Sequence, residues 1–279
     1  MSGQYLTWLV DVLRAAGCNV NENGTTNGWQ SRARSSGGFP STPLGVQWHH
    51  TASNTTPASD LSWMINGSGD APIGNLLLDR TGTYWPIAAG AANTAGKGGP
   101  LTLSRGTIPL DSANTRSVAI EAANNGVGEV WPQAQIDAYF AGSNAINRQL
   151  GNALTDVFNH QTWAPDRKID PATAAAVDGP WRPGGSTSSG TWNQQDVRNE
   201  CAARGGGGGG NVPIMEEDEV KHVVADGRGQ QLLGAGWRYW ARNNHEAGIM
   251  NQLYGPPQVM TTEEYDLATS MLGGPGDSP

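Results

Sequence analysis

The sequence predicts an α/β fold in which helices flank a mixed central β-sheet, followed by a small C-terminal α+β domain. Three observations lead to this prediction. Short apolar segments of strand length alternate with segments of helical periodicity over residues 1–204. The run of six glycines at Gly205–Gly210 then interrupts the chain. A separate set of predicted elements follows at residues 211–279.

The first predicted element is an amphipathic helix near the N-terminus. Its apolar residues recur at the spacing of three and four that places side chains on one face of a helix. Gly17 follows them and marks the expected end of the helix. The apolar residues are Leu6, Leu9, Val10 and Leu13.

Residues 46–122 are expected to hold four strands and one short helix. The strand segments are short, apolar and bounded by turn residues. Arg80-Thr81-Gly82 joins two of them as a hairpin, and Ser59–Ile65 is the predicted helix. The predicted strands are Val46–His49, Asn75–Leu78, Thr83–Ile87 and Ser117–Ala122.

A longer helix is expected after the last of these strands. Pro132 suits the first helical position, and Gly151 follows the last apolar residue. The alternation of strands with helices is the basis for predicting a mixed central sheet. The apolar stripe of this helix consists of Ile136, Tyr139, Phe140, Ile146 and Leu150.

Composition divides the chain into three parts. Consecutive glycines lose too much backbone entropy to favour a helix or strand, so residues 205–210 are expected to form a flexible linker. Residues 211–279 hold ten acidic and four basic residues, and most of the net charge of −8 therefore lies there. We expect a large domain at 1–204 and a small one at 211–279.

The small domain is expected to contain a hairpin and a closing helix. Val220–Ala225 and Gln231–Leu233 are predicted to be strands. The helix is expected to begin at Thr261, which forms a capping box with Glu264, and to end at Gly273. A cluster of aromatic residues between them suits either a small core or a binding face. The cluster contains Trp237, Tyr239, Trp240 and Tyr254, and the hairpin turn is at Gly227.

Charge and hydropathy exclude several classes of protein. The chain of 279 residues has no run of Lys or Arg, which argues against nucleic-acid binding. Its longest apolar stretch near the N-terminus, Tyr5–Leu13, contains Asp11 and follows no basic residue, so neither a signal peptide nor a membrane span is expected. Cys18 and Cys201 form no metal or redox motif, and the sequence leaves open whether they pair.

Two histidines and an aspartate suggest a metal site. His49 ends a predicted strand, and His160 follows the apolar pair Val157-Phe158. Asp170 comes ten residues after His160, beyond a loop that contains proline. Two imidazoles and a carboxylate from separate elements can hold Zn²⁺ and leave its fourth position for water. The spacing alone is more typical of ordinary surface or core histidines than of metal ligands.

Three ordered motifs carry a family resemblance. Residues 45–52 read GVQWHHTA, residues 117–121 read SVAIE, and residues 160–171 read HQTWAPDRKIDP. They are similar to the HHTA signature, the S-I-G-I-E strand and the H-x-x-W-x-P-x-R-K-x-D-P loop of zinc N-acetylmuramoyl-L-alanine amidases. That group includes peptidoglycan recognition proteins and many phage endolysins. The resemblance covers roughly residues 5–200 and is nearest to endolysins of phages that infect actinobacteria.

The resemblance implies a role for each matched residue. His49, His160 and Asp170 would be the Zn²⁺ ligands. Glu121 would act on the attacking water, because a carboxylate can accept a proton and pass it to the leaving amine. Lys168 would stabilise the oxyanion, since a cation aimed at developing charge acts mainly in the transition state.

The sequence departs from the family pattern beside these residues. Thr94 stands where related actinophage proteins often have a histidine, and Gly74 and Asn75 stand where a tyrosine and a histidine are common. None of these positions is a metal ligand in the family. His50 is expected to point to the opposite face of its strand from His49 and to be structural.

The resemblance implies a monomeric peptidoglycan hydrolase that cleaves the amide between N-acetylmuramic acid and the L-alanine of the stem peptide. As an endolysin it would cause host lysis, having no signal peptide of its own and reaching the cell wall from the host cytoplasm after release. Nucleic acid and membrane insertion have no part in this expectation. A non-catalytic peptidoglycan-binding protein and a virion-associated wall hydrolase are the alternatives. By analogy with modular endolysins, residues 211–279 would bind the cell wall.

Tryptophan use is unusual, with eleven tryptophans against three phenylalanines. Trp131 and Trp163 are expected to pack in the core rather than stack on sugar rings. Others could line a groove for a glycan.

Overall fold

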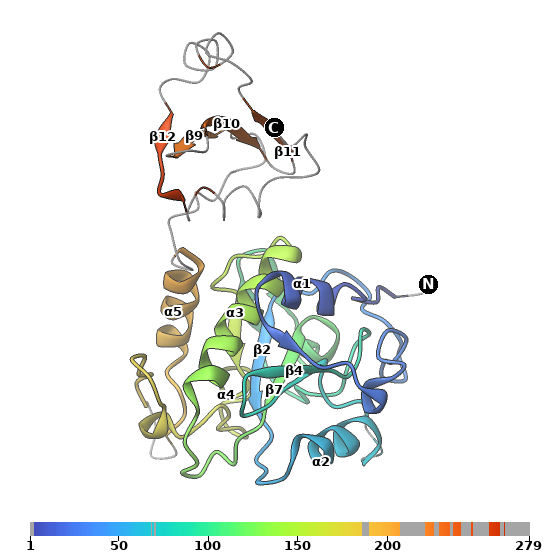
Figure 1. Cartoon of the computed structure of the whole chain (residues 1–279). Helices are drawn as coiled ribbons and strands as arrows, with labels where there is room; N and C mark the ends of the chain where they lie inside the picture. The colour runs from blue at the N-terminus through green and yellow to red at the C-terminus, as the bar shows by residue number, and fades with distance from the viewer. Residues whose placement is uncertain are drawn as a thin grey trace. The chain divides into compact units, whose positions relative to one another are not determined.

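The structure is a computed structural model that describes residues 3–67, 69, 71–185, 190–206, 221–225, 229–234, 237–240, 247, 257–262 and 265. The chain divides into two compact units, Met1–Gly205 and Gly206–Pro279 (Figure 1). All the residues proposed above for catalysis or metal binding lie in the first unit.

A six-stranded sheet forms the centre of the first unit, in the order β1-β4-β3-β7-β2-β8. The pair β3–β4 is antiparallel and forms the predicted hairpin, and the other neighbouring strands are parallel. The sheet is therefore mixed, as predicted. Its strands are β1 (Asn19–Val20), β2 (Val46–His50), β3 (Leu76–Leu78), β4 (Thr83–Pro86), β7 (Val118–Ala122) and β8 (Val157–Asn159).

Four strands of the first unit have no counterpart among the predicted elements. They are β1 and β8, at the two edges of the sheet, and the separate hairpin of β5 (Leu101–Leu103) and β6 (Gly106–Ile108). Each spans only two or three residues. Such segments are too short for a hydrophobic period to distinguish them from loops.

Helices cover the sheet. Helix α3 packs against α1 and lies beside β2 (Figure 1). Trp48 of β2 stacks on Tyr139 of α3 with ring centroids 3.8 Å apart, and its indole N–H donates to Ser143 Oγ at 2.8 Å. The helices and helical turns are α1 (Leu9–Ala15), η1 (Gly24–Thr26), α2 (Pro57–Ser62), η2 (Trp63–Gly67), η3 (Ala113–Thr115), α3 (Gln133–Gln149), α4 (His160–Trp163), η4 (Ala174–Ala176) and α5 (Gln194–Gly206).

The predicted helices differ from the observed ones mainly at their ends. Leu6 is buried but precedes α1, and Gly17 ends that helix with φ +76°, a conformation that favours glycine. Pro132 is extended at ψ 145° and caps α3 instead of occupying its first turn. The predicted short helix is α2, which continues into the π-helical turn η2.

The sheet separates the main core from the face that carries the proposed site. Trp48 and Ile120 belong to the core cluster that includes the apolar residues of α1 and α3. Successive side chains of a strand point to opposite faces. His49 and Glu121, the next residues along β2 and β7, therefore lie together on the other face. Trp131 and Trp163 are fully buried, as expected.

Helix α5 extends into the glycine run, which differs from the prediction that the linker begins at Gly205. Arg148 donates to the Gly205 carbonyl at 2.8 Å. A Cβ on Gly205 would lie 1.9 Å from Leu154 Cδ1, so a larger residue there would displace the Leu154 side chain. Both cysteines are free and buried, and burial raises the pKa of Cys18 to about 11.

The second unit contains a four-stranded sheet in the order β11-β10-β9-β12. The predicted hairpin is present as β9 and β10, with His222 opposite Leu232. Most of the predicted closing helix, and Tyr254 of the aromatic cluster, lie outside the described residues. The strands are β9 (Lys221–Ala225), β10 (Gly229–Gly234), β11 (Trp237–Trp240) and β12 (Gln258–Val259).

Within the described parts of the chain, no helix combines the length and the apolar character needed to span a membrane.

Candidate active site and metal centre

The site is built on two adjacent parallel strands. His49 of β2 pairs in register with Glu121 of β7, so the two side chains project side by side from one face. The hydroxyl of Tyr139 on α3 fixes this pair from behind. It accepts the His49 backbone N–H at 2.8 Å and lies 2.9 and 3.0 Å from the carbonyl oxygens of His49 and Ile120. One buried phenol thus joins both strands at the level of the site.

His160 and Asp170 reach His49 from the next segment of the chain. His160 is the first residue of α4, directly after β8, which pairs with β2. The loop that follows returns to this point, where the Gln161 N–H donates to the Asp170 carbonyl at 3.0 Å. The side chains of His160 and Asp170 are both buried. The edge strand β8 therefore positions the second histidine beside the first.

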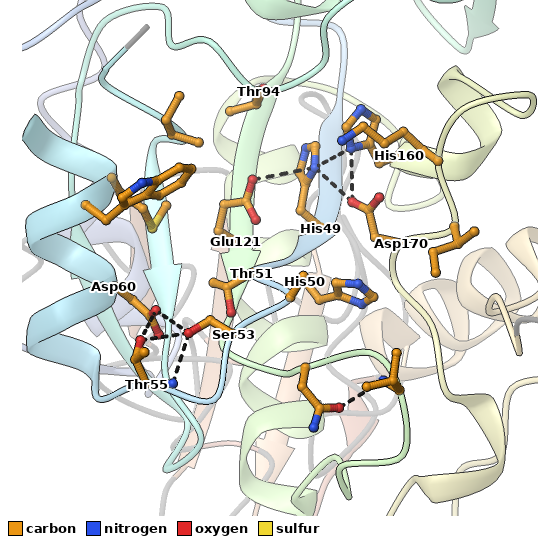
Figure 2. A pocket seen from close by; sticks show the side chains of 18 of the residues that line it. His49, His50, Thr51, Ser53, Thr55, Asp60, Thr94, Glu121, His160 and Asp170 are labelled. Carbon is orange, nitrogen blue, oxygen red and sulfur yellow. Dashed lines mark hydrogen bonds and ion pairs between the residues drawn. The ribbon is translucent and has the colours of Figure 1, made fainter. Parts of the chain in front are cut away.

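Three potential ligand atoms meet at one point (Figure 2). The Nδ1 atoms of His49 and His160 are 2.9 Å apart. Asp170 Oδ2 lies 3.2 Å from His49 Nδ1 and 3.0 Å from His160 Nδ1. Two nitrogens and one carboxylate oxygen are a donor set that suits Zn²⁺.

The protonation of the histidines suits a cation. His160 Nε2 lies 3.0 Å from the Ala95 carbonyl oxygen, which can only accept, so Nε2 carries a proton and Nδ1 is the nitrogen that faces the cluster. Burial, followed by the nearby His160, lowers the pKa of His49 to about 4, so this ring is neutral at physiological pH. A neutral imidazole is the form that binds metals.

Asp170 supplies the negative charge. Burial alone would raise its pKa, but the hydrogen bonds and charges of His160 and His49 hold the pKa of this carboxyl well below its usual range. An ionised carboxylate beside two imidazole nitrogens is a donor set that suits a divalent cation. These residues therefore fit a bound metal on their own chemistry.

Glu121 lies beside the cluster without joining it. Its Oε1 is 3.6 Å from His49 Nδ1, and the residue is only 8% exposed. Burial, and then the charge of Asp170, raise the pKa of Glu121 well above its usual value, although Lys168 acts in the opposite direction. A carboxyl group with a raised pKa next to a metal site is suited to general acid–base chemistry.

Lys168 and His50 occupy different surroundings. Lys168 is half-buried, lines the same pocket as Glu121, and acts electrostatically on His49. His50 points away from the cluster (Figure 2), and its Nδ1 accepts the Ala172 N–H at 3.2 Å. A Cβ on Gly126 would lie 2.1 Å from the His50 ring, so glycine allows this close contact.

The departures from the family pattern have structural explanations at two positions. Asn75 donates to the carbonyls of Ala88 and Gly90 and accepts the Ala119 N–H, all at 2.8–2.9 Å, which ties β7 to a neighbouring loop. Gly74 has φ +89°, and a Cβ there would lie 3.2 Å from Glu121 Cγ. Thr94 lines the pocket.

The cluster opens into a pocket of about 980 Å³. Its wall on the side of α2 contains residues that the motifs do not indicate, chiefly Asp60, Trp63 and the loop that follows His50. Trp63 is 54% exposed, and Val127 and Ile169 are also exposed on the lining. Isolated residues of this kind have no sequence signal, because only the fold brings them to one cavity.

Comparisons with known proteins place the site in a family context. Residues 40–173 match the family model Amidase_2, described as N-acetylmuramoyl-L-alanine amidase. All the matched motif residues, from His49 to Asp170, lie within that range. No curated protein matches the sequence.

Solved structures of several amidases are similar at low sequence identity. The endolysine amidase LysCS from Clostridium intestinale URNW is 15% identical, with 57% of this chain and 88% of that chain covered and a TM-score of 0.40. LysC from the same organism is 13% identical over 66% and 96%, with a TM-score of 0.44. AmiD from E. coli, solved with a muramyl peptide substrate, is 21% identical over 47% and 53%, with a TM-score of 0.39.

Proposed function

Because residues 40–173 form an N-acetylmuramoyl-L-alanine amidase domain of the Amidase_2 family, we propose that this chain is a zinc-dependent enzyme that cleaves the amide between N-acetylmuramic acid and the L-alanine of the stem peptide. The observation that carries the proposal is the convergence of His49, His160 and Asp170 beside the buried Glu121. The pocket in front of them is large enough for part of a muramyl peptide.

His49, His160 and Asp170 would hold the zinc ion. When bound, zinc supplies Lewis acidity, which polarises a carbonyl oxygen and lowers the pKa of a water molecule. The Nε2–H of His160, directed at the Ala95 carbonyl, keeps its Nδ1 available, and the Tyr139 hydroxyl fixes the backbone of His49. These contacts hold the ligand atoms in place before substrate arrives.

Glu121 would move the proton. Its carboxylate faces the cluster, where it can accept a proton from the attacking water and then donate it to the departing amine of L-alanine. Burial raises its pKa and so favours the protonated form that the second step requires. Lys168, on the lining of the same pocket, would stabilise the negative charge that develops on the carbonyl oxygen.

We also propose that the enzyme acts as an endolysin and that residues 211–279 attach it to the wall. The resemblance of the three motifs to actinophage endolysins supports the first part, and the separate C-terminal unit supports the second. Adding the protein to peptidoglycan of an actinobacterial host tests the activity. Release of new L-alanine amino termini is expected, and cleavage of glycosidic or peptide cross-links instead would contradict it.

The complete donor set favours catalysis over recognition alone. A non-catalytic peptidoglycan-binding protein has no need of three ligand atoms and a neighbouring carboxyl group in this arrangement. The virion-associated alternative shares the chemistry, and proteomic analysis of purified virions distinguishes it from an endolysin. Finding the protein in virions would overturn the endolysin role and leave the amidase proposal intact.

A further inference from the structure

Gln47 is a buried polar residue on the same strand as the proposed ligand His49. Its side chain lies in β2 and is completely buried. Neither amide atom, Nε2 or Oε1, has a hydrogen-bond partner among the residues that the structure describes. An amide buried in this way costs folding free energy, because it gives up its hydrogen bonds to water without replacement. Folding alone therefore disfavours glutamine at this position.

The strands on either side of Gln47 offer it apolar neighbours. Its register partners are Ala119 of β7 and Phe158 of β8. Phe158 belongs to a buried apolar cluster on this side of the sheet. The amide of Asn75, which binds the Ala119 N–H, is already hydrogen-bonded to three backbone groups. Gln47 has no hydrogen bond with any of these neighbours.

Gln47 and His49 project from the same face of β2. Successive side chains of a strand alternate between its faces, and Trp48, between the two, packs in the main core. Two residues of a strand extend over about 6–7 Å, a distance that the side chains of glutamine and histidine can jointly span. The next side chain along this face from Gln47 is therefore the His49 ring.

His49 has an unpartnered atom of its own. Its Nδ1 faces His160 and Asp170 in the cluster (Figure 2). Its Nε2 is buried and has no hydrogen-bond partner within the described part of the chain. A neutral imidazole carries one proton, so a ring that binds a cation through Nδ1 has its proton on Nε2. That buried N–H then needs an acceptor.

The other histidine of the cluster shows how this need is met. His160 Nε2 lies 3.0 Å from the Ala95 carbonyl oxygen. His49 Nε2 has no such carbonyl among the described residues. The Oε1 atom of Gln47 is a buried acceptor on the same strand face, and no described donor uses it. A donor without an acceptor and an acceptor without a donor thus belong to side chains two residues apart.

We propose that Gln47 is a positioning residue for the metal ligand His49, whose Nε2–H it accepts at Oε1 when Nδ1 binds the cation. The contact forms by rotation about the side-chain bonds of Gln47, and it fixes both the tautomer and the orientation of the ligand ring. Gln47 does not belong to the pocket lining, so it acts only through His49. This inference rests on the proposed function, because it requires zinc at His49.

The variant Gln47→Met tests the contact through zinc affinity and stability. Methionine has a similar length and is only a weak acceptor. Competition with a chelator is expected to give a zinc Kd about 10–100-fold above the native value, as for loss of a group that orients a ligand. The thermal midpoint of the metal-free variant should equal or exceed the native one, because an unpartnered buried amide is removed. A residue that only supports the fold would not weaken zinc binding while leaving the metal-free protein as stable.

Gln135→Met is the matched control, and Gln47→Glu is the rescue. Gln135 is equally buried, and its amide donates to the carbonyls of Leu78 and Ala123 at 3.2 and 3.0 Å. Its replacement should lower the thermal midpoint and leave the zinc Kd within about twofold of the native value. Gln47→Glu keeps an acceptor oxygen and is expected to bind zinc at least as tightly as the native chain.

The ring proton of His49 gives a direct readout of the contact. In nitrogen–proton correlation spectra of the zinc-loaded native chain, the Nε2–H of His49 should exchange slowly with water. Gln47→Met should shift this signal or lose it through faster exchange. The Nε2–H of His160, held by the Ala95 carbonyl, is the internal reference and should not change.

Two outcomes would overturn the inference alone. Equal zinc affinity of the native chain and Gln47→Met would show that another acceptor serves His49. Weaker zinc binding together with a lower midpoint of the metal-free variant and an unchanged His49 signal would make Gln47 a structural residue. Zinc binding without release of L-alanine from peptidoglycan would reject the amidase proposal and leave the inference intact. A native chain that binds no zinc would overturn both.

Discussion

The carboxylate of Glu121 is buried beside His49 and near the carboxylate of Asp170, and burial together with this second charge disfavours its ionised form. Burying an ionisable group costs folding free energy, and the same burial gives the group the raised pKa that acid–base catalysis needs. His49 shows the opposite shift for the same reason, since burial also disfavours its protonated form. At the scale of single residues, burial of Glu121 and His49 lowers the folding stability and at the same time fixes the protonation states of both groups.

The variant Glu121→Gln tests whether the buried carboxyl group promotes catalysis and lowers stability. We expect kcat to fall by about 10²–10⁴-fold, because the proton carrier is removed while the zinc ligands remain. The metal-free variant is expected to be more stable than the native chain at pH 8 by about 1–3 kcal/mol. Near pH 4 the two should be equal, because the carboxyl of the native chain is then protonated in both folded and unfolded states. Urea unfolding at both pH values provides the check.

The pKa of His49 predicts a second pH effect. In the folded metal-free protein the pKa is about 4 instead of 6.5, so between these values the unfolded chain binds the additional proton. The free energy of unfolding should therefore fall by about 3 kcal/mol as the pH falls from 6.5 to 4. Comparing Glu121→Gln with Glu121→Gln/His49→Gln isolates this contribution from that of Glu121. A constant difference between the two variants across this pH range would contradict the prediction.

At the scale of elements, the site depends on how β2, β7 and α3 are joined. The parallel register places His49 next to Glu121, and the Tyr139 hydroxyl bridges the two strands from α3. Edge strand β8 then brings His160 alongside. Because each ligand comes from a different element, the spacing of the ligand atoms depends on the packing of the whole sheet.

Tyr139→Phe should reveal this dependence. It leaves the buried His49 N–H without its partner and is expected to destabilise the protein by about 1–3 kcal/mol. Zinc affinity should also fall, because the backbone of a ligand is released. Tyr5→Phe is the control, since the Tyr5 hydroxyl makes no hydrogen bond within the described residues, and a change within about 0.5 kcal/mol is expected there. Equal stability of both variants would show that the bridge is unimportant.

The elements that could be predicted from the sequence are those with a clear hydrophobic period. The buried face of α1 and the stripe of α3 follow from helical periodicity, and the strands β2, β3, β4 and β7 follow from short apolar segments bounded by turn residues. The edge strands β1 and β8 could not be predicted, because they hold only one and two apolar residues. Gly205 within α5 also escaped prediction, because its helical conformation depends on tertiary contacts with Arg148 and Leu154.

The candidate site also has residues that could be predicted from the sequence and residues that could not. His49, His160, Asp170 and Glu121 lie in motifs with recognisable spacing, and the fold brings them together. Asp60 and Trp63 lie in no motif. Their relation to the pocket arises only when α2 packs beside the strand ends, and the unpartnered oxygen of Asp60 is a property of that packing.

At the scale of the whole molecule, the proposed chemistry and the proposed wall attachment belong to separate units. The first unit contains the complete cluster and its pocket, and the second has its own sheet with Val223, Leu232 and Tyr265 buried. Under the proposed function, the second unit would hold the enzyme on the insoluble cell wall while the first cleaves it.

A fragment of residues 1–206 tests this division. It retains α5 to its last residue and is expected to cleave a soluble muramyl peptide within about twofold of the full chain. Binding to purified cell walls, measured by co-sedimentation, is expected to fall by about tenfold or more. Undiminished sedimentation of the fragment would remove the wall-binding role from residues 211–279.

The central claim is that His49, His160 and Asp170 hold a catalytic zinc ion. The most direct measurement is bound-metal analysis of the native chain, His160→Ala and His50→Gln, beside the release of L-alanine amino termini from peptidoglycan. We predict stoichiometric zinc and new L-alanine ends for the native chain and His50→Gln, and neither for His160→Ala. Cleavage that persists without zinc, or zinc retained in a folded His160→Ala, would contradict the account.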